Sequence, residues 1–340
     1  MLVYNTSIHT INGDTMTFLL ILSAVFTIFF LITCYVYRIA FYSPKGKRSS
    51  IDDPLQGAQY KAVSEHIHRI SHIMEKIPCE DIWINSFDGC RLYGRYYHVR
   101  DGAPLEILFH GYRSCVFRDC SGGHALSRKM GFNSLAIDQR AHGRSDGITI
   151  SFGIKECRDC LEWIQYANER FGKDTPIILS GLSMGAATVL MATAQKLPDN
   201  VACVMADSPY STPSAILEKV CADQHYPVWL CRPFLHLAAL SLGHFRLNRC
   251  SAKESVRAAN IPILLIHGED DLLVPCSMSW EIAACNPSLV TVHTFPSAGH
   301  GLSYLIDPIR YEQAVCDFLL TVPSVKNEIS SEFLNRKYEI

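Results

Sequence analysis

The sequence has little excess charge of either sign and no long run of basic residues. Of its 340 residues, 19% are Asp, Glu, Lys or Arg, and the formal net charge is -2. This balance argues against a nucleic-acid partner, which needs a basic surface, and against a disordered acidic tail. At 48% hydrophobic residues the chain can bury a large core. The composition therefore favours a globular protein that acts on small molecules.

Patterns typical of metal or disulfide sites are also lacking. The 14 cysteines are too scattered for a disulfide scaffold in a chain of this length. Cys157 and Cys160 form a CxxC, but helical periodicity places them within a helix and no second pair follows at zinc-site spacing. His68 and His72 have i, i+4 spacing, yet HExxH is absent and packing or solvated histidines are the preferred interpretation. We expect neither a metal nor an organic cofactor.

Charged side chains are absent from residues 15–37, which read TMTFLLILSAVFTIFFLITCYVY. A helix of this length measures roughly 34 Å, whereas the hydrocarbon layer of a membrane is roughly 30 Å thick. A cleaved signal peptide is the alternative, but a basic n-region and a small-x-small cleavage site are missing. The sequence therefore predicts one transmembrane anchor at 15–37, preceded by a short segment at 1–14.

Basic residues flank this segment on one side only. No Lys or Arg precedes it, whereas Arg38, Lys45, Lys47 and Arg48 follow it closely. By the positive-inside rule the bulk of the chain should lie in the cytoplasm, where unpaired thiols are also easier to keep reduced. The predicted localisation is a single-pass membrane protein with a cytoplasmic domain.

The remaining chain divides into a linker with a connector helix at 38–80 and an α/β domain at 81–340. In this domain short runs of Ile, Leu and Val alternate with helix-length segments, which is typical of a parallel sheet with helices on both faces. The first two strands flank an Asp88-Gly89 turn. We expect an eight-stranded, mostly parallel sheet built from DIWINS, CRLYGRYYHV, LEILF, NSLAID, PIILSG, VACVMAD, IPILLIHG and LVTVHTF.

An insertion at about 212–255 interrupts this alternation. Its middle is apolar and aromatic, but Arg232 and His236 interrupt it, so a second membrane span is not expected. We interpret it as a small helical cap that covers the active site and shapes the acyl or leaving-group pocket. Extra helix packing at the edge of the sheet is the alternative.

The motif GLSMG, residues 181–185, lies directly between a predicted strand and a predicted helix. A nucleophilic serine requires this strand-turn-helix context, because a sharp turn raises its hydroxyl above the sheet and the flanking glycines avoid Cβ clashes. Ser183 is therefore the candidate nucleophile. The start of the following helix offers the Met184 N–H to a developing oxyanion.

A serine nucleophile needs a base and an acid that orients the base. His300, in PSAGHG, follows the last predicted strand and has a glycine on each side, so we expect it to be the general base. Asp271, in HGEDDLLVP, follows the strand before it and is our choice for the acid. The order Ser, Asp, His is the order of the α/β-hydrolase triad. Three other carboxylates remain alternatives for the acid: Asp207, Glu269 and Asp270.

The second donor of an oxyanion hole should come from the loop after LEILF, where the sequence reads HGY. We choose the Tyr112 N–H, since Gly111 allows this loop to approach a reacting carbonyl closely. His110 is expected to hydrogen-bond locally. Asp138 is expected to organise the next loop, with Arg140 and His142, and to take no part in the chemistry.

Five segments in order, HGYRS, DQRAHGRSDG, GLSMG, HGEDDLLVP and AGHG, resemble the α/β-hydrolase superfamily over about residues 81–320. They are most similar to its bacterial branch described as prolyl-oligopeptidase-like or serine-aminopeptidase-like, with an N-terminal membrane segment. The resemblance implies Ser183, Asp271 and His300 as a triad, and Tyr112 and Met184 as donors of the oxyanion hole. It says little about the substrate, because esterases, thioesterases, lipases, peptidases and acyltransferases share this scaffold.

The predicted function is hydrolysis of a carboxylic ester or thioester through an acyl-enzyme. A serine peptidase or amidase acting on short peptides is the alternative, although no propeller-sized domain is present to restrict access to peptides. A catalytically inactive hydrolase-fold binding module is a third possibility. The expected partners are a small acyl or peptide substrate and the membrane.

Overall fold

One sheet of eight strands forms the centre of the protein. The structure is a computed structural model that describes residues 13–55 and 57–337. The strand order is β1-β2-β4-β3-β5-β6-β7-β8, with β1 and β2 antiparallel to their neighbours and all other pairs parallel. This confirms the predicted eight-stranded, mostly parallel sheet. The strands are β1 Glu80–Asn85, β2 Arg91–Tyr97, β3 Leu105–Phe109, β4 Asn133–Asp138, β5 Ile177–Leu182, β6 Val201–Asp207, β7 Ile263–Gly268 and β8 Val290–Phe295.

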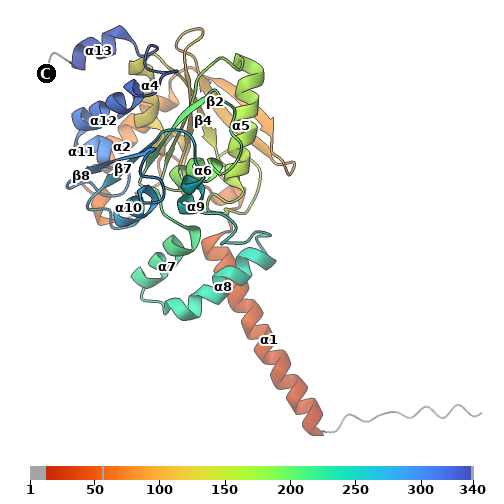
Figure 1. The fold of residues 1–340 in the computed structure, drawn as a ribbon. Helices are drawn as coiled ribbons and strands as arrows, with labels where there is room; N and C mark the ends of the chain where they lie inside the picture. The colour runs from red at the N-terminus through yellow and green to blue at the C-terminus, as the bar shows by residue number, and fades with distance from the viewer. Residues whose placement is uncertain (1–12, 56, 338–340) are drawn as a thin grey trace, which may run out of the picture.

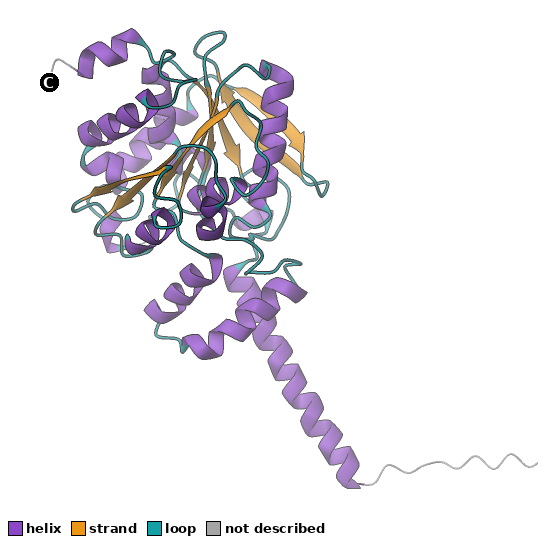
Figure 2. Cartoon of the chain, viewed as in Figure 1, coloured by secondary structure: helices purple, strands orange, loops and turns teal. Residues whose placement is uncertain are grey.

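Helices cover both faces of this sheet, so the central strands are buried on both sides (Figure 2). Strand β5 shows the consequence, because Ile177 and Leu179 belong to one hydrophobic cluster and Ile178 to another. The first cluster includes α5 Glu156–Phe171, α6 Met184–Ala192, α9 Ala252–Arg257 and α10 Ser277–Ala283. The second includes α4 Ser121–Met130 and α12 Pro308–Leu320. Burial on both faces explains why these strands read as continuous apolar runs.

Shorter elements complete the body of the protein. Helix α2 Ser64–Glu75 falls within the predicted connector helix, and α3 Val116–Asp119 follows β3. Helices α11 Ser303–Ile306 and α13 Ser331–Lys337 lie near the C-terminus, and 3-10 turns occur at Lys45–Lys47 and Ala58–Tyr60. All 14 cysteines lie in the described residues and none forms a disulfide; Cys157 and Cys160 are buried on α5. Within the described ranges no cluster of His, Cys, Asp and Glu could hold a metal ion.

A single long helix, α1 Gly13–Ala40, projects from the body (Figure 1). Most of its apolar side chains are exposed, from Met16 to Ile39. Its length and composition suit a helix that crosses a membrane, and a signal sequence would have the same features. Its C-terminal half contacts the rest of the chain, and Phe41, directly after it, is fully buried between Phe152 and Phe245.

The predicted insertion folds as helices beside this projection. Helix α7 Pro213–Asp223 begins at Thr212, whose side chain accepts a hydrogen bond from the Ala215 N–H. Helix α8 Val228–Ser241 then crosses α1, and the rings of Phe29 and Phe234 lie 4.6 Å apart (Figure 1). Because β6 precedes the insertion, these helices leave the sheet at the edge where the parallel strands end. The predicted domain boundaries, and the role of the insertion as a lid, stay predictions.

Candidate active site

Ser183 occupies a sharp turn between β5 and α6. Its φ of 56° and ψ of -113° are strained for a residue with a side chain, and strain of this kind is characteristic of functional turns. The turn is tight, since a methyl group on Gly181 would lie 2.3 Å from the Gly185 carbonyl carbon. One on Gly185 would lie 2.1 Å from the carbonyl oxygen of Phe109 on β3. Both glycines of GLSMG are therefore required by the close approach of neighbouring backbone.

His300 and Asp271 form a buried pair at the same edge of the sheet. His300 Nδ1 lies 2.7 Å from Asp271 Oδ2, and each residue is only 7% exposed. The other oxygen, Oδ1, accepts hydrogen bonds from the backbone N–H groups of Leu273 at 2.9 Å and Val274 at 2.8 Å. The carboxylate is thus fixed on one side by the backbone and on the other side bonds the imidazole.

The other candidate acids are placed elsewhere. Glu269 and Asp270 are exposed, and Glu269 accepts a hydrogen bond from Thr294. Asp207 is half-buried, but its oxygens are bonded by the hydroxyls of Ser208 at 2.9 Å and Tyr311 at 3.2 Å. The geometry therefore pairs His300 with Asp271 among the four carboxylates considered from the sequence.

The histidine loop packs beside the serine turn. A methyl group on Gly301 would touch the Leu182 side chain at 3.1 Å, and the Gly301 N–H donates to Ser208 Oγ at 3.4 Å. Among the described residues no hydrogen bond joins Ser183 Oγ to His300. Hydrogen bonds of this kind often tighten only when substrate binds.

The pair has the electrostatics expected of a base and its partner. Burial alone would raise the pKa of Asp271, but hydrogen bonds with His267 and His300 and the charge of His300 hold it well below its ordinary value. Burial alone would lower the pKa of His300, and the hydrogen bond and charge of Asp271 raise it above the ordinary value instead. Asp271 is thus held ionised beside an imidazole whose protonated form its charge stabilises.

The loop after β3 reaches the serine directly. A methyl group on Gly111 would lie 3.4 Å from Ser183 Cβ, so the backbone of this loop borders Ser183. Asp119 Oδ2 fixes the loop by accepting the Gly111 N–H at 2.7 Å. No hydrogen bond from the Tyr112 N–H is found in the described part of the chain. The Met184 N–H is among the first N–H groups of α6, which lack a partner within the helix.

The segment before the sheet also contacts this loop, which the sequence did not reveal. The Tyr112 hydroxyl donates to the carbonyl of Ala40, the last residue of α1, at 2.8 Å. Its ring stacks on Phe152 with centroids 4.9 Å apart. Arg113 donates to the Tyr42 carbonyl at 3.0 Å. The end of α1 and the residues after it therefore contact the loop that borders Ser183.

Two further residues of the linker hold His300 and were likewise not predicted. The His300 N–H donates to Gln59 Oε1 at 2.9 Å, and the Tyr60 hydroxyl donates to the His300 carbonyl at 3.1 Å. Burial, the largest cause, and the negative charges of Asp119 and Asp271 raise the pKa of Tyr60, so its hydroxyl stays protonated. These contacts link residues more than 200 positions apart, and no local sequence motif signals them.

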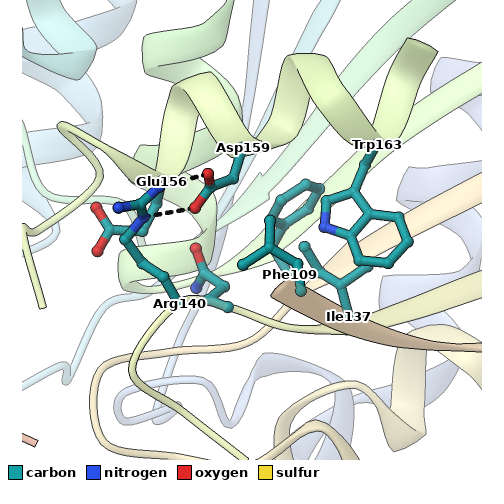
Figure 3. Close-up of a pocket in the computed structure, with 8 residues that line it drawn as sticks. Phe109, Ile137, Arg140, Glu156, Asp159 and Trp163 are labelled. Carbon is teal, nitrogen blue, oxygen red and sulfur yellow. Dashed lines mark hydrogen bonds and ion pairs between the residues drawn. The ribbon is translucent and has the colours of Figure 1, made fainter. Parts of the chain in front are cut away.

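Local hydrogen bonds hold the loops that follow β3 and β4. Asp138 Oδ2 accepts the Arg144 N–H at 2.8 Å, and His110 Nδ1 lies 2.8 Å from the Gly111 carbonyl oxygen. Arg140 forms a two-pronged ion pair with Asp159, both distances being 2.6 Å (Figure 3). Around this pair lie Phe109, Ile137 and Trp163, and the space between them admits no water molecule. This cluster supports the fold and offers no room for a ligand.

Comparison with known proteins gives the same fold. The family model described as alpha/beta hydrolase fold matches residues 107–234, which include Tyr112 and Ser183. The uncharacterized protein YqkD of Bacillus subtilis is 24% identical over 260 residues, which cover 76% of this chain and 85% of YqkD. The alpha/beta hydrolase domain-containing protein WAV2 of Arabidopsis thaliana is 22% identical over 246 residues, which cover 71% of this chain and 78% of WAV2.

A solved structure extends the comparison. The esterase Pf2001 of Pyrococcus furiosus superimposes with a TM-score of 0.60 at 22% sequence identity, covering 79% of this chain and 97% of that chain. At this level of identity the likeness concerns the fold. The strand order, the turn between β5 and α6 and these matches agree, and the chain has the α/β-hydrolase fold.

Proposed function

We propose that this protein is a serine hydrolase that cleaves a carboxylic ester or thioester through an acyl-enzyme, with Ser183 as nucleophile, His300 as base and Asp271 as the orienting acid. The observation that supports this most is the buried His300–Asp271 pair, 2.7 Å apart, in a loop that packs against the strained turn of Ser183. The fold and its esterase neighbour support a hydrolase; the ester or thioester substrate and the covalent intermediate are our proposal.

In this mechanism His300 Nε2 takes the proton of the Ser183 hydroxyl as the oxygen attacks the acyl carbon. Asp271, bonded to Nδ1, holds the proton-free nitrogen toward the serine and stabilises the imidazolium. The N–H groups of Tyr112 and Met184 receive the negative charge that develops on the acyl oxygen. His300 then protonates the leaving alcohol or thiol, and the acyl group stays on Ser183 until water, activated by the same histidine, releases it as an acid.

Labelling by a fluorophosphonate probe tests the nucleophile. The full-length protein should be labelled, and Ser183→Ala should abolish both labelling and ester turnover, the latter by several orders of magnitude. Ser180→Ala, three residues earlier on β5, is the matched control and should keep both. Labelling that persists in Ser183→Ala would show that another residue is the nucleophile.

A substrate panel tests the reaction class. Acyl esters and thioesters of increasing chain length should be hydrolysed, and aminoacyl amides much more slowly, because a poor amine leaving group demands more of the acid step. Faster cleavage of amides than of matched esters would overturn the esterase assignment. It would also favour the peptidase-like branch of the superfamily, which remains a prediction from the sequence.

We further propose that α1 is a retained anchor and that the domain lies on the cytoplasmic side. Its support is the apolar length of α1 together with the basic residues that follow it, Arg38, Lys45, Lys47 and Arg48. Protease treatment of intact cells should leave a C-terminal tag intact, and lysis should expose it. Loss of the tag without lysis would place the domain on the outer side.

A further inference from the structure

Helix α8 presents apolar side chains that no other described part of the chain covers. Trp229 is 78% exposed, although it lies in an apolar helix, and Leu230 and Leu240 are about half exposed. Tyr226, in the turn before α8, is exposed as well. Large aromatic and aliphatic side chains gathered on one helix usually mark a contact surface.

The position of α8 on α1 identifies what covers this surface. Phe234 of α8 contacts Phe29 of α1, with ring centroids 4.6 Å apart. Phe29 precedes Tyr37, the last residue of the uncharged run, by eight positions, which corresponds to about 12 Å along a helix. Because a hydrocarbon layer is about 30 Å thick, a point this far inside the uncharged run lies within one leaflet. A helix packed there lies at the same depth.

The charges of the two insertion helices are arranged to suit such a position. Arg232, the one Lys, Arg, Asp or Glu of α8, donates two hydrogen bonds to Glu218 of α7, both at 2.7 Å. Lys219 of α7 is paired with Asp223 one turn later. The four charges cancel in two ion pairs, which lowers the cost of bringing them close to lipid.

We infer that α8 is a second membrane element, lying in the same leaflet as the C-terminal half of α1 with lipid acyl chains against Trp229, Leu230 and Leu240. Its 14 residues measure about 21 Å, so it enters the leaflet without crossing the bilayer. This inference rests on the proposal that α1 is a retained span. Figure 1 shows α7 and α8 beside α1, on the side of the body from which α1 projects.

The arrangement places the candidate site at the membrane surface. Helix α7 contacts the loop of the proposed acid, since Lys219 Nζ donates to the carbonyl of Leu272, next to Asp271. The end of α1 contacts the proposed oxyanion loop through Tyr112 and Ala40. The end of α1 and helix α7, to which α8 is bonded through Arg232, therefore contact the loops around Ser183. An acyl chain that lies in the leaflet beside α1 and α8 would have a short path to the proposed nucleophile.

Quenching of tryptophan fluorescence by brominated phospholipids tests the inference. The full-length protein is placed in phosphatidylcholine vesicles whose acyl chains carry bromine at shallow, middle or deep positions, and the loss of emission is measured. Bromine within the acyl chains should quench the protein, and Trp229→Phe should remove most of that quenching. Trp280→Phe is the matched control, since Trp280 is 54% exposed on α10 in the body, and should leave the quenching unchanged.

The outcomes separate this inference from the proposed function. Quenching equal in the native protein and in Trp229→Phe would overturn the inference, and a chain that fails to enter vesicles would overturn it together with the anchor. The measurement needs no activity and can be repeated with Ser183→Ala. Trp229-dependent quenching in a protein that no fluorophosphonate labels would support the membrane position of α8 and overturn only the serine mechanism.

Discussion

The loops after β5, β7 and β8 and the segment at 40–60 contribute to the candidate site in different ways. The loops present the side chains of the proposed triad, Ser183, Asp271 and His300, at the carboxyl ends of three parallel strands of the sheet. The segment offers hydrogen bonds to those loops, from the Ala40 carbonyl, the Gln59 amide and the Tyr60 hydroxyl. The first group should therefore determine whether the reaction occurs, and the second how accurately the reacting groups are placed.

Among the substitutions that test this comparison, we expect Asp271→Asn to cause the largest loss of turnover. Asp271→Asn keeps the shape of the side chain but removes the charge that orients His300, and turnover should fall by about three to four orders of magnitude. Asp270→Asn is the matched control, exposed and one residue away, and should stay within a few-fold of the native rate. Steady-state kinetics on one ester provide the measurement. Equal losses in both variants would contradict the assignment of the acid.

The pH profile should show how the two groups are coupled. His300 acts as a base only when neutral, and Asp271 raises its pKa, so kcat/KM should fall as the pH drops through a value above the ordinary histidine pKa. Without the carboxylate charge the pKa of His300 should be lower, so the acid limb of Asp271→Asn should move to lower pH. An acid limb at the same pH in both proteins would assign it to another group.

A smaller effect is expected from the linker contact to the histidine loop. Gln59→Ala removes the acceptor of the His300 N–H, and a less precisely held imidazole should lower kcat by about tenfold with little change in KM. Gln59→Glu retains an acceptor and should restore most of the rate. Gln165→Ala, on the exposed side of α5, is the control. A rise in KM with an unchanged kcat would instead place Gln59 in substrate binding.

The smallest effect is expected at the contact between α1 and the oxyanion loop. Tyr112→Phe leaves the backbone N–H in place and removes the hydroxyl that donates to Ala40, so kcat should fall only a few-fold. Thermal unfolding should show a loss of about 1 kcal/mol, the usual contribution of one hydrogen bond. Tyr166→Phe, on the surface of α5, provides the comparison. A loss as large as that of Asp271→Asn would mean that the hydroxyl itself takes part in the reaction.

These two regions also differ in how far the sequence predicted them. The eight strands and the serine turn followed from local features, namely apolar runs buried on both faces and glycines at positions 181 and 185 where neighbouring backbone leaves no room for a Cβ. The acid was more difficult, because three adjacent carboxylates share one loop and only the fold shows which of them is buried against His300. Its role remains a prediction, as do those of Ser183 and His300.

The contacts of the linker could not be predicted in this way. Gln59 and Tyr60 occur at the start of the stretch predicted as a connector helix, and nothing in its pattern indicates a partner about 240 positions away. Such pairing depends on how the whole chain closes on itself. The same holds for the contact of Phe29 with Phe234, since one residue belongs to the apolar run and the other to the insertion, and no sequence pattern links these two segments.

The burial of Phe41 has a practical consequence for preparing a soluble fragment. Cutting the chain at the apparent start of the hydrolase motifs, near residue 80, would remove Phe41 from between Phe152 and Phe245 and leave an opening in the core. It would also remove Arg48, whose guanidinium donates to the carbonyls of Gly143 at 2.9 Å and Gly147 at 2.6 Å. A fragment that begins ahead of Ala40 keeps both Phe41 and Arg48. Any exposed apolar residues of α1 that remain in this fragment should be exchanged for polar ones.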